Sequence, residues 1–445
     1  MKGLKELILY RPREGELLGR LAWLLQELEN LEEEKKLSGE DALNLTYEKN
    51  EIQDQYFGCM QELIEIGESH GFSGNLWHCY LTYLLVYHEN AFSKACEIRG
   101  AVEGGINSVA LHDFAIFREL FRYDFSELEK KLQVSVYPMI ADYIHASSER
   151  KIFNRRIRDR ICTLSVQLAN AETVEEFKAD MEQFYREFGV GKFGLHKAFR
   201  VEHDEEGVRI VPITNIAHVY LEDLVGYEIP KQKLIENTEA FLQGKRANNC
   251  LLFGDAGTGK SSSIKGILNR YYDQGLRIIE VYKHQFQDLN EIISQIKNRN
   301  YKFIIYMDDL SFEDFEIEYK YLKAVIEGGL EKKPNNILIY ATSNRRHLIR
   351  ENYSDKEEIR QDMHTSDTVQ EKLSLAYRFG VSIFFCAPDK KEFQNIVKVL
   401  AQKHGITMPE EELLLEANKW ELNHGGLSGR TAQQFIDYIS AKQEQ

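Results

Sequence analysis

The sequence predicts an α/β fold in which a parallel five-stranded sheet is preceded by a mainly helical N-terminal domain and followed by a helical lid. Three observations support this prediction. Leucines recur at spacings of three and four near the N-terminus, short apolar runs alternate with helical stretches beyond Pro212, and a glycine-rich loop follows one of these runs. Strands that alternate with helices form parallel sheets, because each helix carries the chain back across a face of the sheet.

The length and composition of the chain narrow the classes of protein to consider. With 445 residues it exceeds the length at which one hydrophobic core stops growing, so two or more domains are expected. The formal net charge of -15 argues against a protein that coats nucleic acid through its overall field, although a local basic patch would suffice. Its six cysteines include no C-x-x-C pair, and no apolar run is long enough to span a bilayer. We therefore expect a reduced, cytoplasmic setting and no membrane partner.

Residues 1–192 are expected to form the helical domain. Their clearest pattern is a stripe of leucines, which are Leu17, Leu21, Leu24, Leu28 and Leu31. Such a stripe is typical of a coiled-coil seam or of an amphipathic helix that faces a core. Since it lasts only about two heptads, the core helix is the better interpretation. A basic segment at 150–160 is either a nucleic-acid-binding patch or, as we favour, a solvated helix face.

Residues 193–214 are expected to form a hairpin or linker, because apolar and polar residues alternate on both sides of the polar turn 203–207. Residues 215–387 carry the apolar runs that are expected to form the five-stranded core. After Pro388 such runs cease and helical segments continue, so 388–445 is expected to be the lid. The five expected strands are Cys250–Phe253, Arg277–Tyr282, Phe303–Met307, Ile337–Ala341 and Val381–Cys386.

The glycine-rich loop fits the phosphate-binding pattern G-x-x-x-x-G-K-[ST] at every fixed position. A chance match in a chain of this length has a probability on the order of a few per cent. Glycines let backbone N–H groups surround phosphates, Lys260 would reach the β- and γ-phosphates, and Ser261 would ligate Mg²⁺. The alternative is a glycine-rich turn with an incidental lysine. The residues expected to bind ATP or ADP are Gly254, Asp255, Ala256, Gly257, Thr258, Gly259, Lys260, Ser261 and Ser262.

Polar side chains also follow two other expected strands. Asp308 and Asp309 come directly after 303–307, which is the Walker B arrangement of a carboxylate at the metal edge of a sheet. Asp308 would hold Mg²⁺, and Asp309 would orient or deprotonate the attacking water. Asn344, just beyond 337–341, is the candidate for positioning that water. The alternatives are a solvated turn or helix cap for the acidic pair and a turn-forming role for Asn344.

Together these motifs resemble those of AAA+ ATPases over residues 215–445. Within that class the chain is similar to an uncharacterised bacterial family that carries the segments Thr342–Leu348 and Ser428–Ala432, and then to bacterial replication initiators and helicase loaders. The resemblance implies that the segment Leu224, Val225, Gly226 and Tyr227 lines an adenine pocket. It thereby extends the expected nucleotide site to residues ahead of the glycine-rich loop.

The resemblance also implies roles for two arginines. Arg378 corresponds to an arginine finger, which reaches the γ-phosphate held by a neighbouring subunit, and Arg430 corresponds to the lid arginine called sensor 2. The alternative for Arg378 is a cation at a helix C-terminus, where the helix dipole favours positive charge. Arg430 follows an expected N-cap at Ser428, and a cation near a helix N-terminus opposes the dipole, so a phosphate partner is the better explanation.

One departure from the class affects the expected rate. Most AAA+ proteins carry Asp-Glu where this chain has Asp308-Asp309, so the presumed base is one methylene shorter here. Replication initiators resemble this chain in using two aspartates. Hydrolysis is therefore expected to be slow. The chain is thus expected to be an ATP hydrolase that remodels or regulates a protein or DNA client, in a nucleotide-dependent homo-oligomer. The rival is a nucleotide-binding regulatory scaffold with negligible turnover. A third reading, a small-molecule kinase, needs an acceptor pocket that the sequence does not identify.

Overall fold

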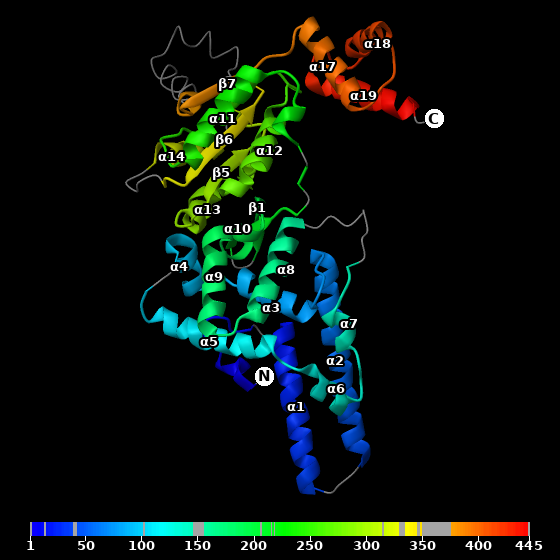
Figure 1. Cartoon of the computed structure of the whole chain (residues 1–445). Coiled ribbons are helices and arrows are strands. Elements are labelled where there is room, and N and C mark those ends of the chain that lie inside the picture. The colour runs from blue at the N-terminus through cyan, green and yellow to red at the C-terminus, as the bar shows by residue number, and fades with distance from the viewer. Residues whose placement is uncertain are drawn as a thin grey trace. The chain divides into compact units, whose positions relative to one another are not determined.

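The structure is a computed structural model that describes residues 2–12, 15–38, 42–100, 103–145, 155–204, 207–214, 216–217, 219–313, 316–328, 334–344, 348 and 375–443. The chain divides into two compact units, Met1–Leu195 and His196–Gln445, each of which is described by itself. Figure 1 labels most of their α-helices and several of the strands. Across the described ranges, no helix is both long and apolar enough to cross a membrane.

The first unit is helical, as predicted (Figure 1). Several of its helices begin at polar caps that the sequence supplies. The Asn90 side chain accepts a hydrogen bond from Ser93 N and closes a capping box, and Thr173 does the same with Glu176. The elements are η1 (Lys2–Glu6), α1 (Leu17–Ser38), α2 (Ala42–His70), α3 (Leu76–Tyr87), α4 (Ala91–Arg99), α5 (Ile106–Phe121), α6 (Phe125–Leu132), α7 (Tyr137–Ala141), α8 (Arg155–Asn170), α9 (Val174–Phe188) and α10 (Gly191–Leu195).

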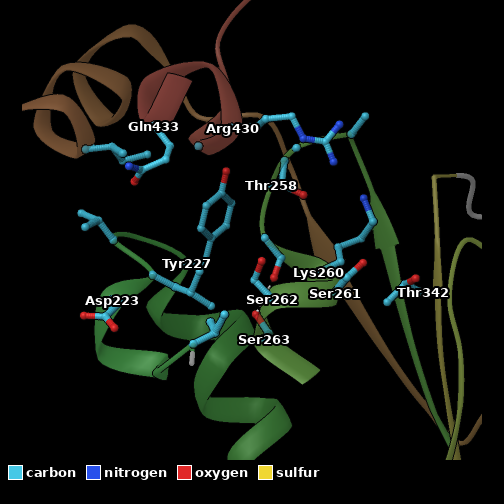
Figure 2. A pocket seen from close by; sticks show the side chains of 18 of the residues that line it. Asp223, Tyr227, Thr258, Lys260, Ser261, Ser262, Ser263, Thr342, Arg430 and Gln433 are labelled. Carbon is cyan, nitrogen blue, oxygen red and sulfur yellow. Dashed lines mark hydrogen bonds between the residues drawn. The ribbon is translucent and has the colours of Figure 1, made fainter. Parts of the chain in front are cut away.

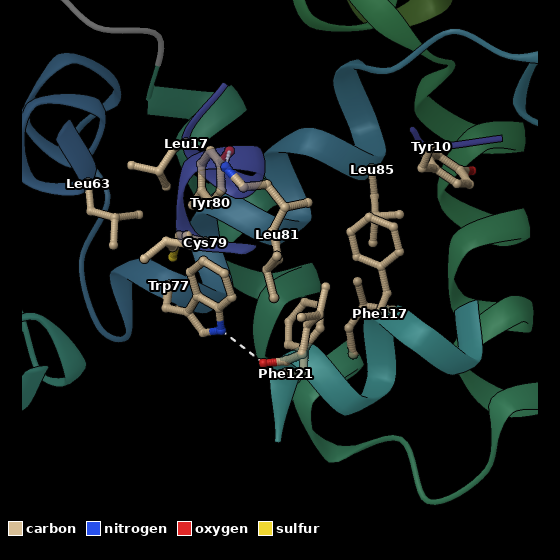
Figure 3. Close-up of a cluster of buried hydrophobic side chains, with 14 of the residues drawn as sticks. Tyr10, Leu17, Leu63, Trp77, Cys79, Tyr80, Leu81, Leu85, Phe117 and Phe121 are labelled. Atoms are coloured by element: carbon tan, nitrogen blue, oxygen red, sulfur yellow. Dashed lines mark hydrogen bonds between the residues drawn. The ribbon is translucent and has the colours of Figure 1, made fainter. Parts of the chain in front are cut away.

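The leucine stripe of α1 faces the core of this unit. Its first four leucines, at 17, 21, 24 and 28, are buried in the same apolar cluster as Trp77. Figure 3 shows part of that cluster, in which the indole Nε1 of Trp77 donates a hydrogen bond to the carbonyl of Leu120 at 2.9 Å. The core-helix interpretation therefore holds for these four positions, whereas the side chain of Leu31 lies outside the described residues. Residues 150–154 of the basic segment also lie outside them.

A buried carboxylate fastens the N-terminal segment to this unit. The side chain of Asp113 in α5 is fully buried and accepts backbone hydrogen bonds from Ile8, Leu9 and Tyr10 at 2.7 to 3.1 Å. Its Oδ1 also lies 3.0 Å from Nδ1 of His112. Removing the carboxylate would leave several buried N–H groups without an acceptor. An unsatisfied buried donor lowers the free energy of unfolding by more than the net contribution of an ordinary hydrogen bond.

We expect Asp113→Ala to lower the melting temperature of the N-terminal unit by roughly 4 to 8 °C, from a loss of about 2 kcal/mol spread over a domain of this size. Differential scanning calorimetry of the full chain measures this. The matched control is Glu119→Ala, which removes an exposed acid from the same helix and should change the melting temperature little. Equal melting temperatures for the two variants would show that the hydrogen bonds from Asp113 to the N-terminal segment do not stabilise this unit.

The second unit is built on one seven-stranded sheet with the order β2-β1-β4-β5-β6-β3-β7. The five strands of the core are parallel, as predicted, and the apolar runs expected from the sequence lie on them. The strands are β1 (Ala198–Asp204), β2 (Gly207–Pro212), β3 (Cys250–Gly254), β4 (Leu276–Glu280), β5 (Lys302–Met307), β6 (Ile337–Ser343) and β7 (Val381–Phe385).

The prediction of five strands was wrong by two, because the hairpin that we expected in a linker joins the sheet. β1 pairs with β2 in antiparallel register and with β4 in parallel register, where Ala198 lies opposite Ile278. The buried positions of β1, which include Phe199 and Val201, need a covered face that an isolated linker hairpin lacks. The parallel pairing to β4 joins residues about 80 positions apart, as the register pair shows, and local sequence carries no signal for it.

Helices complete the second unit. α11 and α12 pack their apolar side chains, among them Leu234, Ile264 and Ile267, on one face of β3, β5 and β6. In Figure 1, α11 and α12 are drawn beside β5 and β6. The elements are η2 (Leu221–Asp223), α11 (Glu228–Leu242), α12 (Lys260–Tyr271), η3 (Tyr272–Gln274), η4 (Lys283–Asp288), α13 (Leu289–Ile296), α14 (Glu318–Glu327), α17 (Lys390–Lys403), α18 (Glu410–Asn423) and α19 (Gly429–Gln443).

The last three of these helices form the lid, which has an apolar cluster of its own. Phe393, Ile396 and Val397 of α17 are buried against Phe435 and Ile436 of α19. Val225, which lies ahead of the glycine-rich loop in sequence, packs against the same cluster. The lid is therefore a small helical body in contact with the segment that the sequence assigned to an adenine pocket.

Candidate functional site

The glycine-rich loop connects β3 to α12, and its backbone needs glycine at three positions. Gly254, Gly257 and Gly259 have φ angles of +132°, +76° and +86°, which side-chain-bearing residues rarely adopt. A Cβ atom on Gly254 would lie 2.1 Å from the carbonyl oxygen of Phe385, and one on Gly257 would lie 2.9 Å from Oγ of Ser428. The loop is thus held between the end of β7 and the start of the lid.

Lys260 opens α12 at the mouth of this loop. The residue is 7% exposed, and its ammonium donates hydrogen bonds to the carbonyls of Gly254, at 2.9 Å, and Asp255, at 2.6 Å. Burial lowers the pKa of Lys260, and the nearby carboxylates of Asp255, Asp309 and Asp308 oppose that shift. An anion beside this ammonium would offset the cost of its burial and strengthen its charged form.

Asp308 directly follows β5, where its carboxylate accepts hydrogen bonds from two hydroxyl groups and lies near a third, that of Tyr306. Ser261 Oγ donates to Oδ1 of Asp308 at 2.7 Å, and Thr342 Oγ1 donates to the same oxygen at 2.5 Å. Partial burial raises the pKa of Asp308, but the hydroxyls of Thr342, Tyr306 and Ser261 outweigh it, so the pKa lies below its ordinary value. The carboxylate is therefore ionised at neutral pH, and its charge is lost only as the pH falls through that lowered pKa.

Asp309 has an unusual backbone and one side-chain partner in this edge of the sheet. Its φ of +51° is in the left-handed region, which aspartate and asparagine tolerate better than most residues. Its backbone N–H donates to Oγ1 of Thr342 at 2.9 Å, and its Oδ1 accepts a hydrogen bond from Nδ2 of Asn344 at 2.8 Å. The parallel register of β5 and β6 brings these groups together, because Met307 lies opposite Ala341.

One pocket of about 740 Å³ is lined by Lys260, Ser261, Asp308, Asp309, Thr342 and Asn344. Figure 2 shows side chains that project into it from α12, from the segment around Tyr227, from β6 and from the lid. One end is polar and belongs to the glycine-rich loop and the acidic pair, whereas apolar side chains of the lid and of residues 224–225 form another part. The lining residues beyond the loop include Leu224, Val225, Tyr227, Lys231, Asp308, Asp309, Thr342, Asn344, Ile396, Leu400, Arg430, Gln433 and Gln434.

The structure brings most of the predicted site residues to this pocket. Leu224, Val225, 256–262, Asp308, Asp309, Asn344 and Arg430 all line it. Three predicted residues do not line it: Gly226, Gly254 and Asp255, of which Asp255 donates from its backbone N–H to the carbonyl of Phe385 at 3.0 Å. Arg378 does not line the pocket; its guanidinium forms an ion pair with Glu327 at the end of α14.

The lid reaches the loop through Arg430. The backbone N–H of Arg430 donates to the carbonyl of Gly257 at 3.1 Å, and its side chain lines the pocket beside the loop (Figure 2). The hydroxyl of Ser428 accepts a hydrogen bond from Thr431 N at 3.0 Å, which caps the first turn of α19 and keeps Arg430 in that turn. The cation thus lies where the helix dipole alone would disfavour it.

Sequence reasoning missed several residues of the pocket. Lys231 is buried, and its ammonium donates to the carbonyl of Leu224 at 2.7 Å and to Glu228 at 2.8 Å. Gln433 and Gln434 lie three and four positions after Arg430, so they share its side of α19, and that helical spacing was a usable signal. For Lys231 no comparable signal exists, because its place in the pocket depends on how α11 packs.

The donor groups fit a magnesium ion that arrives with a nucleotide. Among the residues that the structure describes, no cluster of three His, Cys, Asp or Glu side chains could hold a metal by itself. Nucleotide-bound Mg²⁺ takes one or two protein oxygens and completes its shell with phosphate oxygens and waters. The hydroxyl of Ser261 and the carboxylate of Asp308, 2.7 Å apart, are such a pair.

The fold and the pocket together define the class. A parallel sheet that carries a phosphate-binding loop after β3, an acidic pair after β5 and a helical lid over the loop is the arrangement of AAA+ P-loop proteins. The chain belongs to the family described as "Protein of unknown function (DUF815)", which matches residues 194–443. That match covers nearly the whole second unit.

The solved structures to which part of this chain is similar include two of RuvB and one of FIGL-1. A point mutant of RuvB from Thermotoga maritima is 16% identical in sequence, with a TM-score of 0.35. The match covers 49% of this chain and 64% of the RuvB chain, which is less than two thirds of its length. The Thermotoga maritima RuvB Holliday junction branch migration motor shares 14% identity over 49% and 71%, with a TM-score of 0.32. The AAA domain of FIGL-1 in complex with ADP is 15% identical in sequence, and the match covers 52% of this chain and 75% of the FIGL-1 chain, with a TM-score of 0.36. No curated protein matches the sequence significantly.

Proposed function

We propose that the protein binds ATP in this pocket and hydrolyses it slowly, and that the nucleotide state controls the lid and, through it, an unknown protein or DNA client. The observation that carries the proposal is the convergence of Lys260, the Ser261–Asp308 pair and Arg430 on one pocket of about 740 Å³. These groups come from α12, β5 and the lid, and each is a type that recognises phosphate or its metal ion.

The polar end suits a triphosphate. Backbone N–H groups of the loop stand at the N-terminus of α12, where the helix dipole favours an anion. The ammonium of Lys260 already lies there, bonded to two loop carbonyls, and a phosphate oxygen is the stronger partner for it because the bond joins opposite charges. Arg430 adds a second cation from the lid.

Magnesium would be held by Ser261 and Asp308 and would neutralise charge on the bound phosphates. The hydrogen bond from Asn344 to Oδ1 of Asp309 fixes the orientation of that carboxylate and leaves its second oxygen to accept a proton from water. Asn344 thus positions the water through Asp309.

Coupling to the lid follows from the bond between Arg430 N and the carbonyl of Gly257. Any movement of the loop on binding or losing phosphate displaces the first turn of α19. The client then responds to the lid or to the helical unit, and assembly into a homo-oligomer would place Arg378 beside a neighbour's pocket.

A nucleotide-binding regulatory scaffold with negligible turnover is the second candidate. It is favoured by the short carboxylate at Asp309, which already has Asn344 as a hydrogen-bond partner. Steady-state phosphate release, measured over a range of protein concentrations and with and without DNA, separates the two candidates. Turnover above background in any of these conditions supports the hydrolase, and none in all of them supports the scaffold.

We expect Lys260→Ala to weaken ATP binding by roughly tenfold or more, since a hydrogen bond between charged groups contributes about 1.5 to 3 kcal/mol. Isothermal titration calorimetry measures the affinity, and circular dichroism checks that the variant is folded. The matched control is Lys233→Ala, an exposed lysine of α11 outside the pocket, which should bind ATP normally. Unchanged affinity in folded Lys260→Ala protein would contradict the proposed phosphate site.

A further inference from the structure

Two cysteines of the helical unit meet between neighbouring helices. Cys79 lies in α3 and Cys162 in α8, and these helices pack against each other (Figure 1). Both residues are free thiols, and their side chains are hydrogen-bonded to each other. The pair therefore meets the first geometric requirement of a disulfide, which is that the two side chains point towards one another.

The surroundings hold the two sulfur atoms in place. Cys79 is 1% exposed and belongs to the apolar cluster of Figure 3. Its Sγ lies 3.8 Å from the carbonyl oxygen of Ser73 and 3.7 Å from Oγ of Ser165. The hydroxyl of Ser165 in turn donates to the carbonyl of Cys162 at 2.8 Å. One serine of α8 thus contacts both members of the pair.

The two thiols differ in access to solvent and in acidity. Cys162 is only half-buried, and the residue after it, Thr163, is exposed. The hydrogen bond from Cys79 lowers the pKa of Cys162, and partial burial opposes that shift. The same bond, followed by burial, raises the pKa of Cys79. Because a thiolate is the nucleophile in thiol–disulfide exchange, Cys162 is the thiol suited to attack and Cys79 the one suited to follow.

A purely structural role explains other cysteines of this unit better than it explains this pair. Cys59 and Cys96 are fully buried, as small apolar side chains of a core are. Cys162 instead combines partial exposure with a second thiol in contact, which is the arrangement of an attacking and a resolving cysteine.

We propose that Cys79 and Cys162 form a reversible redox site, which closes to an intramolecular disulfide by exchange with a small-molecule disulfide. The site belongs to the helical unit and does not depend on the nucleotide chemistry proposed above. A closed disulfide would covalently link α3 to α8.

The exchange takes place in two steps. The Cys162 thiolate attacks one sulfur of the small disulfide, whose S–S bond breaks as one small thiolate leaves. Cys79 then gives its proton to solvent and attacks the sulfur of Cys162, which expels the second small thiolate. Two protein thiols are oxidised and one disulfide is reduced to two thiols, so atoms and electrons balance.

The contact between the thiols also favours the second step. The largest cause of the raised pKa of Cys79 is its hydrogen bond to Cys162. Once Cys162 carries the small thiol, it no longer holds a negative charge that stabilises the proton on Cys79. Cys79 is therefore easier to deprotonate at the stage where it has to attack.

The test treats full-length Cys386→Ser protein, which lacks an exposed competing thiol, with bis(2-hydroxyethyl) disulfide. Peptide mapping by mass spectrometry should find one disulfide, between Cys79 and Cys162, and dithiothreitol should remove it. In the same background Cys79→Ala should instead retain one small thiol on Cys162. The matched control is Cys96→Ala, which removes another buried thiol of the unit and should still form the link.

Alkylation of Cys162 by iodoacetamide at pH 7 tests the contact without any oxidant. Cys79→Ala should slow it by roughly tenfold, because the thiolate loses its hydrogen-bond donor. Cys79→Ser keeps a donor at that position and should slow it less. Circular dichroism checks that each variant is folded.

Three results would overturn the proposal. The first is a folded parent protein in which Cys162 keeps the small thiol and never links to Cys79. The second is a mixture of links that involves the other cysteines as often as this pair. The third is an alkylation rate of Cys162 that is the same in Cys79→Ala protein, since Cys162 would then owe its reactivity to something other than Cys79.

Discussion

Arg378→Ala should bind ATP almost normally and hydrolyse it roughly 10³- to 10⁵-fold more slowly, which is the effect of an arginine that stabilises charge on a transferring phosphoryl group. The position of the residue explains both halves of this expectation. Arg378 does not line the pocket of its own chain, and its guanidinium pairs with Glu327. It therefore contributes to catalysis only if assembly brings it to a neighbour's γ-phosphate. Single-turnover hydrolysis and ATP titration measure the two quantities.

Mixing Arg378→Ala with Lys260→Ala subunits tests the assembly directly. At some interfaces an intact loop from one variant then meets an intact arginine from the other, so part of the activity should return. Two results would count against the finger: hydrolysis per subunit that stays constant on dilution to a proven monomer, or undiminished turnover in Arg378→Ala protein.

Glu327→Gln separates catalysis from folding at this ion pair. It removes the negative partner while keeping the length of the side chain, so the arginine is retained. Turnover should stay within a few fold of the parent value or rise. If both substitutions instead lowered the melting temperature and the turnover together, Arg378 would be a structural residue of its own chain.

Asp309→Asn should lower turnover by roughly 10² to 10⁴ while ATP and Mg²⁺ still bind, since the amide keeps the shape of the carboxylate but cannot take a proton from water. Asparagine also tolerates the left-handed backbone at this position, where φ is +51°. Its amide oxygen can still accept the hydrogen bond from Asn344. The substitution should therefore leave the fold and the loop unchanged.

Asp308→Asn is the companion variant, because it alters the proposed metal ligand next door. It should weaken the dependence of ATP binding on Mg²⁺, whereas Asp309→Asn should keep that dependence and lose only hydrolysis. Calorimetry with and without Mg²⁺, together with phosphate release, distinguishes the two. Normal turnover in Asp309→Asn protein would show that the proposed base lies elsewhere.

Local spacing was enough to predict the phosphate-binding loop and the acidic pair. Gly254–Ser261 follows a buried strand and enters a helix, and Asp308 ends another strand. Parallel strands deliver their carboxyl ends to one edge of a sheet, so the strand pattern alone implied that Asp308, Asp309 and Asn344 would approach the loop. The structure describes the hydrogen bonds that result from this register.

The sequence by itself thus predicted that the glycine-rich loop and the acidic pair would lie together, because these residues directly follow strands whose ends share one edge of the sheet. Only the tertiary structure decided what completes the site and the sheet. The hairpin joined β4 through a pairing of distant residues. Lys231 lines the pocket because of how α11 packs, and Gln433 reaches it from the lid. Such contacts depend on how whole helices and strands pack against one another. The pattern of neighbouring residues along the chain does not specify that packing, nor which distant strand a given strand will pair with.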